Sequence, residues 1–338
     1  MLRAFSNFAN NTDFHNPLGK PEHQLLSRKE KIKGRILPLL GQVSLFALSV
    51  GMSAMTSGVS DAVLGVAVLS GVVTYLRRSS YTNYKKKILP QNTYDPNIPA
   101  DIVRFRENYP AHSELPLQLR RLSGEVGLEK APLIHVGKNT TFAGIIDLNL
   151  GKKQDLLIEL NSEFLEKQTP ELLNHILAHE LGHGKFGHTN SLPGVVSGTA
   201  VATHISVGIQ LGLAGNYLGG IFYAAAAFAG HTAANAKLQQ YKERECDRHA
   251  LLVSGVVPEA VAFFEKETVA LGKDEPTGLR LAFGALKTVE SMFFAHPSSE
   301  KRADYMRSFN RANKGYVEKK RALNGIAPHR PRTDFRMV

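Results

Sequence analysis

The hydrophobic positions of this chain are concentrated in long stretches that carry no charge. Residues 36–60 are 25 consecutive residues without Asp, Glu, Lys or Arg, and residues 62–76 are 15 more. A helix that crosses the hydrocarbon core of a bilayer needs about 20 apolar residues. The pattern therefore predicts a transmembrane hairpin over residues 36–76 with its turn at Asp61, and a pair of buried core helices is the alternative.

A second uncharged stretch extends over 51 residues, from 186 to 236. It is long enough for two crossings with a turn near Asn216. Small residues recur at four-residue spacing, as in Gly208 and Gly212, which lets helices approach closely in a bilayer. These features favour a second membrane hairpin inserted in the domain described below. Polar residues such as His204 leave open a helical cover outside the bilayer.

The periodicity of the chain changes between these two stretches. Residues 77–110 contain several prolines and are predicted to form an extended linker. Leucines at helical spacing predict a helix over residues 113–126. Short apolar runs predict three strands, at residues 133–136, 140–146 and 156–160. The pattern therefore predicts an α+β fold, mainly helical with a small β-sheet, attached to transmembrane helices.

A further helix is predicted to begin at Thr169, which is a favoured N-cap residue and is followed by proline and glutamate. This helix carries the sequence His179-Glu180-Leu-Gly-His183. Two histidines four residues apart project from one face of a helix and can bind one metal ion. Glu180 lies beside the first histidine, where it can act as general base toward a water molecule. We therefore interpret this helix as part of a zinc site.

Zinc in a catalytic site needs a third protein ligand and an open position. A third histidine six residues after the second is excluded, because Thr189 occupies that position. The next acidic residues are Glu243, Glu245 and Asp247, of which the first and last share one face of a helix. We predict that Glu243 is the third ligand, that Asp247 orients a ligand histidine, and that Glu245 is a solvated surface charge.

These motifs resemble a known family. His179-Glu-Leu-Gly-His183 followed by Glu243-x-x-Cys-Asp247 is similar to the HExxH and ExxAD signature of the HtpX, Oma-type and CAAX-prenyl (Ste-type) membrane zinc metallopeptidases. The chain departs from that pattern at Cys246, where the family usually has alanine. Cysteine is small and is often buried, so we expect the exchange to be tolerated.

Two further elements carry the resemblance. His296-Pro297 followed by Arg302 is similar to the HPxxxxR element of the family, and Thr140-Thr-Phe-Ala-Gly resembles its Asn-Ala-Phe-Ala strand beside the active site. The resemblance makes His296, Arg302 and Phe142 candidate contacts to the substrate or transition state, although a structural role for His296 and Arg302 is equally compatible. It implies a zincin-type metallopeptidase domain over residues 111–310, with one Zn²⁺ per chain.

The net charge of +11 is distributed in three blocks, at residues 1–35, 77–90 and 301–338, and the rest of the chain is mildly acidic. The protein has no tryptophan, and aromatic and basic residues do not alternate outside these blocks. Because a nucleic-acid interface needs a basic face, we predict no nucleic-acid partner. The single cysteine excludes an internal disulfide.

Basic residues flank the first hairpin on both sides and are missing from its turn. The positive-inside rule then places both ends in the cytoplasm. We expect residues 1–35 to form a basic cytoplasmic tail, and residues 311–338 to form a basic C-terminal tail that lies on anionic lipid or stays solvated. An even number of crossings keeps the active site cytoplasmic. A bacterial inner membrane fits best, and a eukaryotic organelle membrane is the alternative.

The combined prediction is a membrane-bound zinc endopeptidase that cleaves membrane or misfolded proteins. Its partners would be protein or peptide substrates and the lipid bilayer. A CAAX-type processing protease is one alternative, although such enzymes usually have a larger membrane barrel than two to four helices provide. A catalytically inactive membrane scaffold is another, which the intact Glu180 opposes. Nothing in the sequence specifies the substrate or the oligomeric state.

Overall fold

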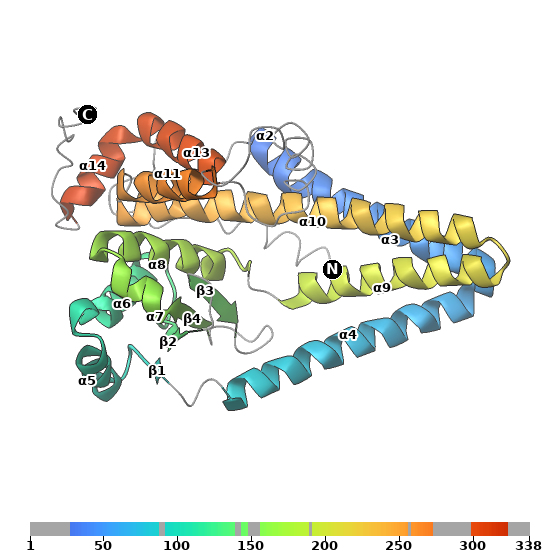
Figure 1. The fold of residues 1–338 in the computed structure, drawn as a ribbon, viewed down its shortest axis with the longest axis horizontal. Helices are drawn as coiled ribbons and strands as arrows, with labels where there is room; N and C mark the ends of the chain where they lie inside the picture. Colours follow the sequence, from blue (N-terminus) through green and yellow to red (C-terminus); the bar gives the residue numbers. More distant parts are fainter. Residues whose placement is uncertain are drawn as a thin grey trace.

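The structure is a computed structural model, and it has two parts that share one long helix (Figure 1). One part is an elongated group of helices, called the bundle below. The other combines a small sheet with shorter helices and is called the sheet domain. The structure describes residues 28–87, 92–138, 143–147, 156–188, 191–255, 258–272 and 299–323.

The bundle is formed by four helices that pack side by side and project away from the sheet domain (Figure 1). The first two of these helices in the chain come after a short helical segment, residues 28–36, which runs directly into the first of them. They are separated by Gly58, whose φ of 90° is readily adopted only by glycine. The other two are separated by a turn at Asn216, whose side chain accepts a hydrogen bond from the backbone of Gly219. The elements are α2 (Arg28–Lys31), a π-helical turn (Ile32–Ile36), α3 (Leu37–Ser57), α4 (Val59–Lys87), α9 (Ser191–Leu213) and α10 (Tyr217–Ser254).

Large apolar side chains cover the outside of the bundle, and small ones fill its inside. Exposed examples on its four helices are Leu40, Val43, Leu64, Val68, Ile205, Ile209, Ile221 and Phe222. At the crossing of α9 and α10, a Cβ added to Gly208 would lie 2.9 Å from the carbonyl oxygen of Gly220. By length and composition, two helical segments of the described chain could cross a membrane, Lys29–Ser57 and Val196–Leu213, and α4 adds the shorter apolar segment Leu64–Leu76.

The sheet has four strands in the order β1-β2-β4-β3. The central pair, β2 and β4, is parallel, and both outer strands are antiparallel to their neighbours. Register is fixed by Ile134 opposite Ile158, both fully buried, and by Ile145 opposite Ile158 on the other side. The strands are β1 (Thr93–Tyr94), β2 (Leu133–Gly137), β3 (Ala143–Asp147) and β4 (Leu156–Asn161). The three predicted strands are therefore present, with β3 described from Ala143 onward.

Helices cover the sheet and build two hydrophobic cores. The larger core joins the sheet to α6, α8 and the end of α10, and includes Leu119, Leu160, Leu177 and Val253. The smaller core joins the end of α10 to α11, α13 and α14. The helices are α5 (Pro99–Asn108), a 3-10 turn (Pro110–His112), α6 (Leu115–Glu125), α7 (Ser162–Lys167), α8 (Pro170–Lys185), α11 (Pro258–Gly272), α13 (Ser299–Ala312) and α14 (Lys314–Leu323).

The stretch predicted to be an extended linker, 77–110, is folded over much of its length. α4 continues to Lys87, and residues 93–108 provide β1 and α5. The rings of Tyr94 and Phe105 are buried and lie 5.1 Å apart, edge to face. Pro99 and Pro110 occupy the first turns of helices, where the missing N–H has no partner to lose. These prolines therefore begin helices rather than mark an extended segment.

Part of the stretch predicted to be a basic tail, 311–338, is also folded. α14 packs on the sheet domain with Val317 buried. Lys320 donates a hydrogen bond to Glu125 at 2.8 Å, and Arg321 pairs with Glu259 at 3.1 Å. Basic residues of this helix are thus paired with carboxylates of the domain, which is why the charge run does not behave as a solvated tail.

Candidate metal centre

Helix α8 carries two of the three candidate metal ligands and packs between α10 and the sheet. It begins as predicted, with the Thr169 side chain accepting a hydrogen bond from the backbone of Leu172. A Cβ added to Gly182 would lie 3.3 Å from the sulfur of Cys246 on α10. One added to Gly184 would lie 2.8 Å from a methyl group of Leu156 on β4. The two glycines therefore allow α10 and the sheet to approach the helix closely.

The close approach of α10 brings Glu243 to the two histidines of α8. The Nε2 atoms of His179 and His183 lie 3.1 Å apart. The carboxylate oxygens of Glu243 lie 3.3 Å from Nε2 of His179 and 3.4 Å from Nε2 of His183. Three potential ligand atoms thus converge from two helices, and His179 and Glu243 are each 7% exposed. Two imidazoles and a carboxylate are a donor set that suits catalytic zinc, so the residues fit the ion that the motif implies.

Asp247 lies behind this group, one turn further along α10. Its Oδ1 is 2.8 Å from Nδ1 of His179, so it faces the nitrogen that points away from Glu243. Arg302 of α13 donates two hydrogen bonds to Asp247, at 2.9 and 2.6 Å, and Tyr305 donates a third. The Arg302 guanidinium also stacks 4.1 Å from the centre of the Phe264 ring. A buried carboxylate with such partners fixes both its own position and the orientation of the histidine.

The electrostatics of the centre favour a cation. Burial by itself lowers the pKa of His179, but the charges and hydrogen bonds of Asp247 and Glu243 raise it to about 10. Burial raises the pKa of Asp247, whereas the charges of Arg302 and His179 outweigh this and lower it to about 2. Asp247 is therefore a carboxylate at neutral pH. The negative potential that would stabilise a proton on His179 would equally stabilise a metal ion.

Glu180 follows His179 on α8 and is 9% exposed. Arg302 belongs to the centre by its contact with Asp247, and its Nη2 lies 4.0 Å from Glu243. The other two candidate contacts, His296 and Phe142, lie outside the described residues.

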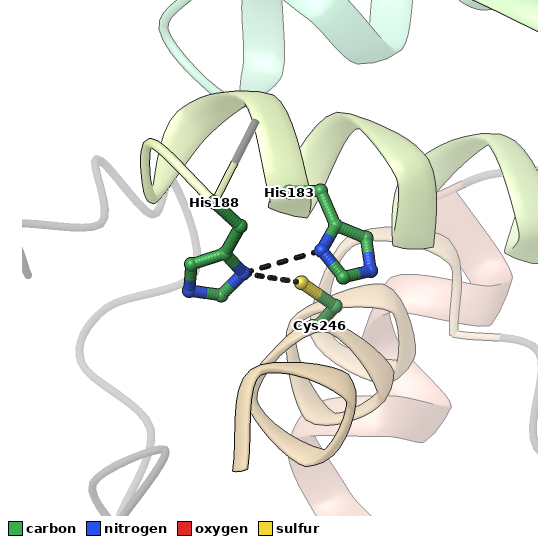
Figure 2. Close-up of side chains that lie close together, drawn as sticks. All are labelled: His183, His188 and Cys246. Carbon is green, nitrogen blue, oxygen red and sulfur yellow. Dashed lines mark hydrogen bonds between the residues drawn. The ribbon is translucent and has the colours of Figure 1, made fainter. Parts of the chain in front are cut away.

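The prediction for Glu245 is wrong, because this residue is not a solvated surface charge. It is 4% exposed, and its Oε2 lies 3.2 Å from Nε2 of His188. The other ring nitrogen of His188 lies 3.2 Å from Nδ1 of His183 and 3.4 Å from the sulfur of Cys246, as Figure 2 shows. Because α10 is covered on several faces, the position of Glu245 opposite the Glu243–Asp247 face does not expose it.

Sequence reasoning also missed Tyr305 and His188. Tyr305 lies three residues after Arg302 on α13, so a helix through the HPxxxxR element could have suggested it. The signal for His188 was the Gly187 that precedes it, since glycine one residue past a helix end is typical of a C-terminal turn that folds back on the helix.

The fold and the site together are those of a metallopeptidase: a helix with the HExxH motif lies beside a small sheet, and a buried carboxylate on a second helix faces the two histidines. Residues 145–309 match the family model of peptidase family M48. The match confirms the family resemblance drawn from the motifs. The match extends from β3 to α13 and contains every described residue of the centre. No curated protein and no solved structure gives a significant match to the chain.

Proposed function

We propose that the protein is a membrane-bound zinc endopeptidase that cleaves membrane or misfolded proteins. The observation that carries the proposal is the convergence of His179, His183 and Glu243 within the region that matches peptidase family M48. Glu180 stands next to one of these ligands in the chain, where a peptidase of this kind needs its general base.

Zinc held by these three residues supplies Lewis-acid chemistry, lowering the pKa of water and polarising a carbonyl group. The chain itself supplies the proton transfer. The Glu180 carboxylate takes a proton from the attacking water and later delivers it to the nitrogen of the leaving amine. The Asp247 carboxylate, 2.8 Å from Nδ1 of His179, favours the ring proton on that nitrogen, which keeps Nε2 free for the metal. Arg302 holds Asp247, and we assign it a positioning role rather than a direct contact with substrate.

Recognition of substrate backbone is supported by the position of β3. Among the described strands, β3 lies at one edge of the sheet, pairing with β4 on one side only. It also packs against α8, the helix that carries the two histidines. An extended peptide can add to such an edge through backbone hydrogen bonds, which do not depend strongly on side chains. This arrangement suits unfolded segments of varied sequence.

Membrane attachment is supported by the bundle. Its outer side chains are large and apolar on all four helices, and a surface of this kind is unusual for a protein in water. Its two hairpin turns lie at the end far from the sheet domain (Figure 1). The segment of α2 and the π-helical turn, which carries Lys29, Lys31 and Arg35, lies at the near end (Figure 1). By the positive-inside rule, the sheet domain and its metal centre would face the cytoplasm.

The peptidase activity is tested with the full-length protein in detergent, using an unfolded membrane protein as substrate and self-cleavage as a second readout. Glu180→Gln removes the base and keeps all three proposed ligands. We expect a loss of at least about 100-fold in rate, in the range for a lost general base. Glu163→Gln, at an exposed position of α7, is the matched control and should cleave like the parent.

The outcomes of this experiment separate the alternatives. Equal cleavage by Glu180→Gln and the parent would exclude Glu180 as the base. A parent that binds one zinc ion but cleaves nothing would favour the scaffold function over the peptidase.

The membrane topology is tested by labelling introduced cysteines from outside sealed vesicles. The natural Cys246 is fully buried, so it should contribute little background, and the unaltered chain controls for it. Lys167→Cys reports on the sheet domain and Tyr217→Cys on the far turn, and both positions are exposed. With the cytoplasmic face inside, only Tyr217→Cys should react. Reaction of Lys167→Cys alone would reverse the proposed orientation.

A further inference from the structure

Helix α8 ends in a way that returns the chain onto the metal centre. Gly187 adopts a φ of 67°, which favours glycine. The backbone N–H of His188 donates to the carbonyl of His183 at 2.9 Å, and that of Gly187 donates to Gly184 at 3.2 Å. This pair of bonds is the Schellman motif. It anchors the backbone of His188 directly on the residue whose side chain is a proposed metal ligand.

The side chain of His188 is then fixed at both ring nitrogens. Nδ1 faces Nδ1 of His183 at 3.2 Å, and Nε2 faces the carboxylate of Glu245 at 3.2 Å. The side chains of His188 and Glu245 are each 5% exposed, so water does not compete freely for these contacts. The ring of Phe186 packs against that of His188, with centroids 5.6 Å apart.

The direction of the hydrogen bonds follows from the proposed metal centre, on which this inference rests. His183 turns Nε2 toward Glu243 and His179, so a metal there leaves the proton of the neutral ring on Nδ1. That N–H can donate to His188 only if Nδ1 of His188 is unprotonated. His188 must then carry its proton on Nε2, which donates to Glu245.

We propose that His188 is a positioning residue of the metal centre, which accepts a hydrogen bond from Nδ1 of His183 and donates one to Glu245. Each histidine ligand is then oriented by a carboxylate of α10. His179 is held directly by Asp247, and His183 is held by Glu245 through His188. Cys246 also approaches Nδ1 of His188, at 3.4 Å (Figure 2), but burial raises the pKa of its thiol well above the ordinary value. It stays a weak thiol donor toward the same nitrogen, beside the hydrogen bond from His183.

The test measures the zinc affinity of full-length protein in detergent, by competition with a chelating indicator. His188→Leu removes both hydrogen bonds and should weaken zinc binding by about 10- to 100-fold, the usual effect of losing a partner of a ligand histidine. Glu245→Gln should cause a smaller loss, because its amide oxygen still accepts from His188. His188→Gln can both accept and donate, and it should recover part of the affinity lost in His188→Leu. Cys246→Ala is the matched control and should bind zinc like the parent.

Two further measurements separate a positioning role of His188 from a merely structural one. The melting temperature of the metal-free variants reports on a merely structural role. A lower melting temperature for His188→Leu with unchanged zinc affinity would overturn the proposal. The visible spectrum of bound Co²⁺ should change in His188→Leu, because the ligand geometry relaxes, and should stay unchanged in Cys246→Ala.

A different use of the same side chains is also detectable. His183, His188 and Cys246 lie close enough together to hold an ion themselves. Two metal ions per parent chain, with a sulfur-to-cobalt charge-transfer band that disappears in Cys246→Ala, would overturn the hydrogen-bond assignment. A parent chain that binds no metal would refute the metal centre of the proposed function, whereas equal affinities of parent and His188→Leu would refute this inference alone.

Discussion

Helix α10 runs through both parts of the molecule, and its two halves differ in the side chains that they bury. In the bundle half, residues 217–236, the large apolar residues Ile221 and Phe222 are 66% and 72% exposed, while Gly220 and Ala227 face inward. In the domain half, residues 237–254, the charged residues Glu243 and Asp247 are buried. Along this one helix, the buried positions therefore change from mainly small, uncharged residues to a set that includes carboxylates.

The difference shows what stabilises each half. Buried carboxylates are tolerated only with partners, and the domain half provides them from α8 and α13. The bundle half instead relies on close approach of backbones at small residues, as at Gly208 and Gly220. Substitutions can test the domain half and the bundle half separately.

The largest effect is expected from Asp247→Ala in the domain half. The change removes the carboxylate to which Arg302 donates two hydrogen bonds, and the Arg302 side chain is only 15% exposed. Losing one partner of a buried pair costs about 3–5 kcal/mol of unfolding free energy. Denaturant unfolding in detergent would measure the loss. Asp304→Ala, which breaks an exposed pair with Arg307 on the same helix as Arg302, should cost about 1 kcal/mol or less.

A double substitution separates the cost of an uncompensated charge from the loss of the pair itself. Asp247→Leu combined with Arg302→Met removes both charges, so it should recover part of the stability lost in Asp247→Ala. It should not recover zinc affinity, because His179 still lacks its carboxylate. Equal unfolding midpoints for Asp247→Ala and the parent would show that the pair contributes nothing to the domain half.

The next effect is a loss of stability of the domain half in mild acid. Burial lowers the pKa of His175 and of His249 to about 3, against 6.5 in the unfolded chain. The unfolded state therefore takes up protons first, so this stability is complete above about pH 6.5 and decreases as the pH falls toward 3. Each histidine contributes a slope of about 1.4 kcal/mol per pH unit. At pH 5.5 the two together cost about 3 kcal/mol.

Denaturant unfolding measured from about pH 7.5 to about pH 5 checks this prediction. His175→Gln should reduce the slope by about one proton relative to the parent. Its amide can still contact Ser254, which lies 3.3 Å from Nδ1 of His175. An unchanged slope would mean that His175 already takes up its proton in the folded state.

In the bundle half, Gly208→Ala is expected to cost about 1–3 kcal/mol, because the new methyl group would overlap Gly220 and Ala224 on the neighbouring helix. Gly65→Ala on α4 is the matched control, since a Cβ there would meet nothing within 4 Å. It should be neutral or slightly stabilising, through its better helix propensity. Melting in detergent measures both, and zinc affinity should be unchanged in both. A loss of zinc binding in Gly208→Ala would show that the two halves of α10 are coupled.

Local rules explain how much of the fold and the site could be predicted from the sequence. The N-cap at Thr169 and the pair His179 and His183 depend only on helix geometry, so they were visible in the chain. Glu243 could be found because the 62 residues between Glu180 and Glu243 contain no other acid. The lengths of the uncharged stretches predicted the apolar helices of the bundle and its turn at Asn216. The first turn lies at Gly58 and not at the predicted Asp61, which belongs to the first turn of α4.

The predictions that failed depended on tertiary contacts. Glu245 was predicted to be exposed from its place on one helix, but its burial depends on His188, which lies 57 residues earlier in the chain. Pro99 and Pro110 begin helices, and Lys320 and Arg321 of α14 pair with Glu125 and Glu259. In each case the residue type allows two structures, and a partner distant in sequence selects between them.

The smallest losses of stability are expected from replacing a serine by alanine where its hydroxyl contacts a buried histidine. The bundle and the sheet domain each offer such a serine. In the bundle, Ser49 contacts His204 and lies 2.6 Å from the hydroxyl of Tyr223. In the domain, Ser254 lies 3.3 Å from His175. Each change should cost about 1 kcal/mol, since net hydrogen-bond contributions are similar in membranes and in water. Ser308→Ala, at an exposed helical position, measures the gain in helix propensity that partly offsets the cost.

The size of the two losses decides how the bundle is stabilised. If small-residue packing is its main support, Ser49→Ala should cost no more than Ser254→Ala, although it removes a contact shared by three helices. A cost for Ser49→Ala that exceeds the other by about 2 kcal/mol or more would lie outside the range for one hydrogen bond. The bundle would then depend on a polar network as the domain half does, and the contrast between the two halves of α10 would be one of degree.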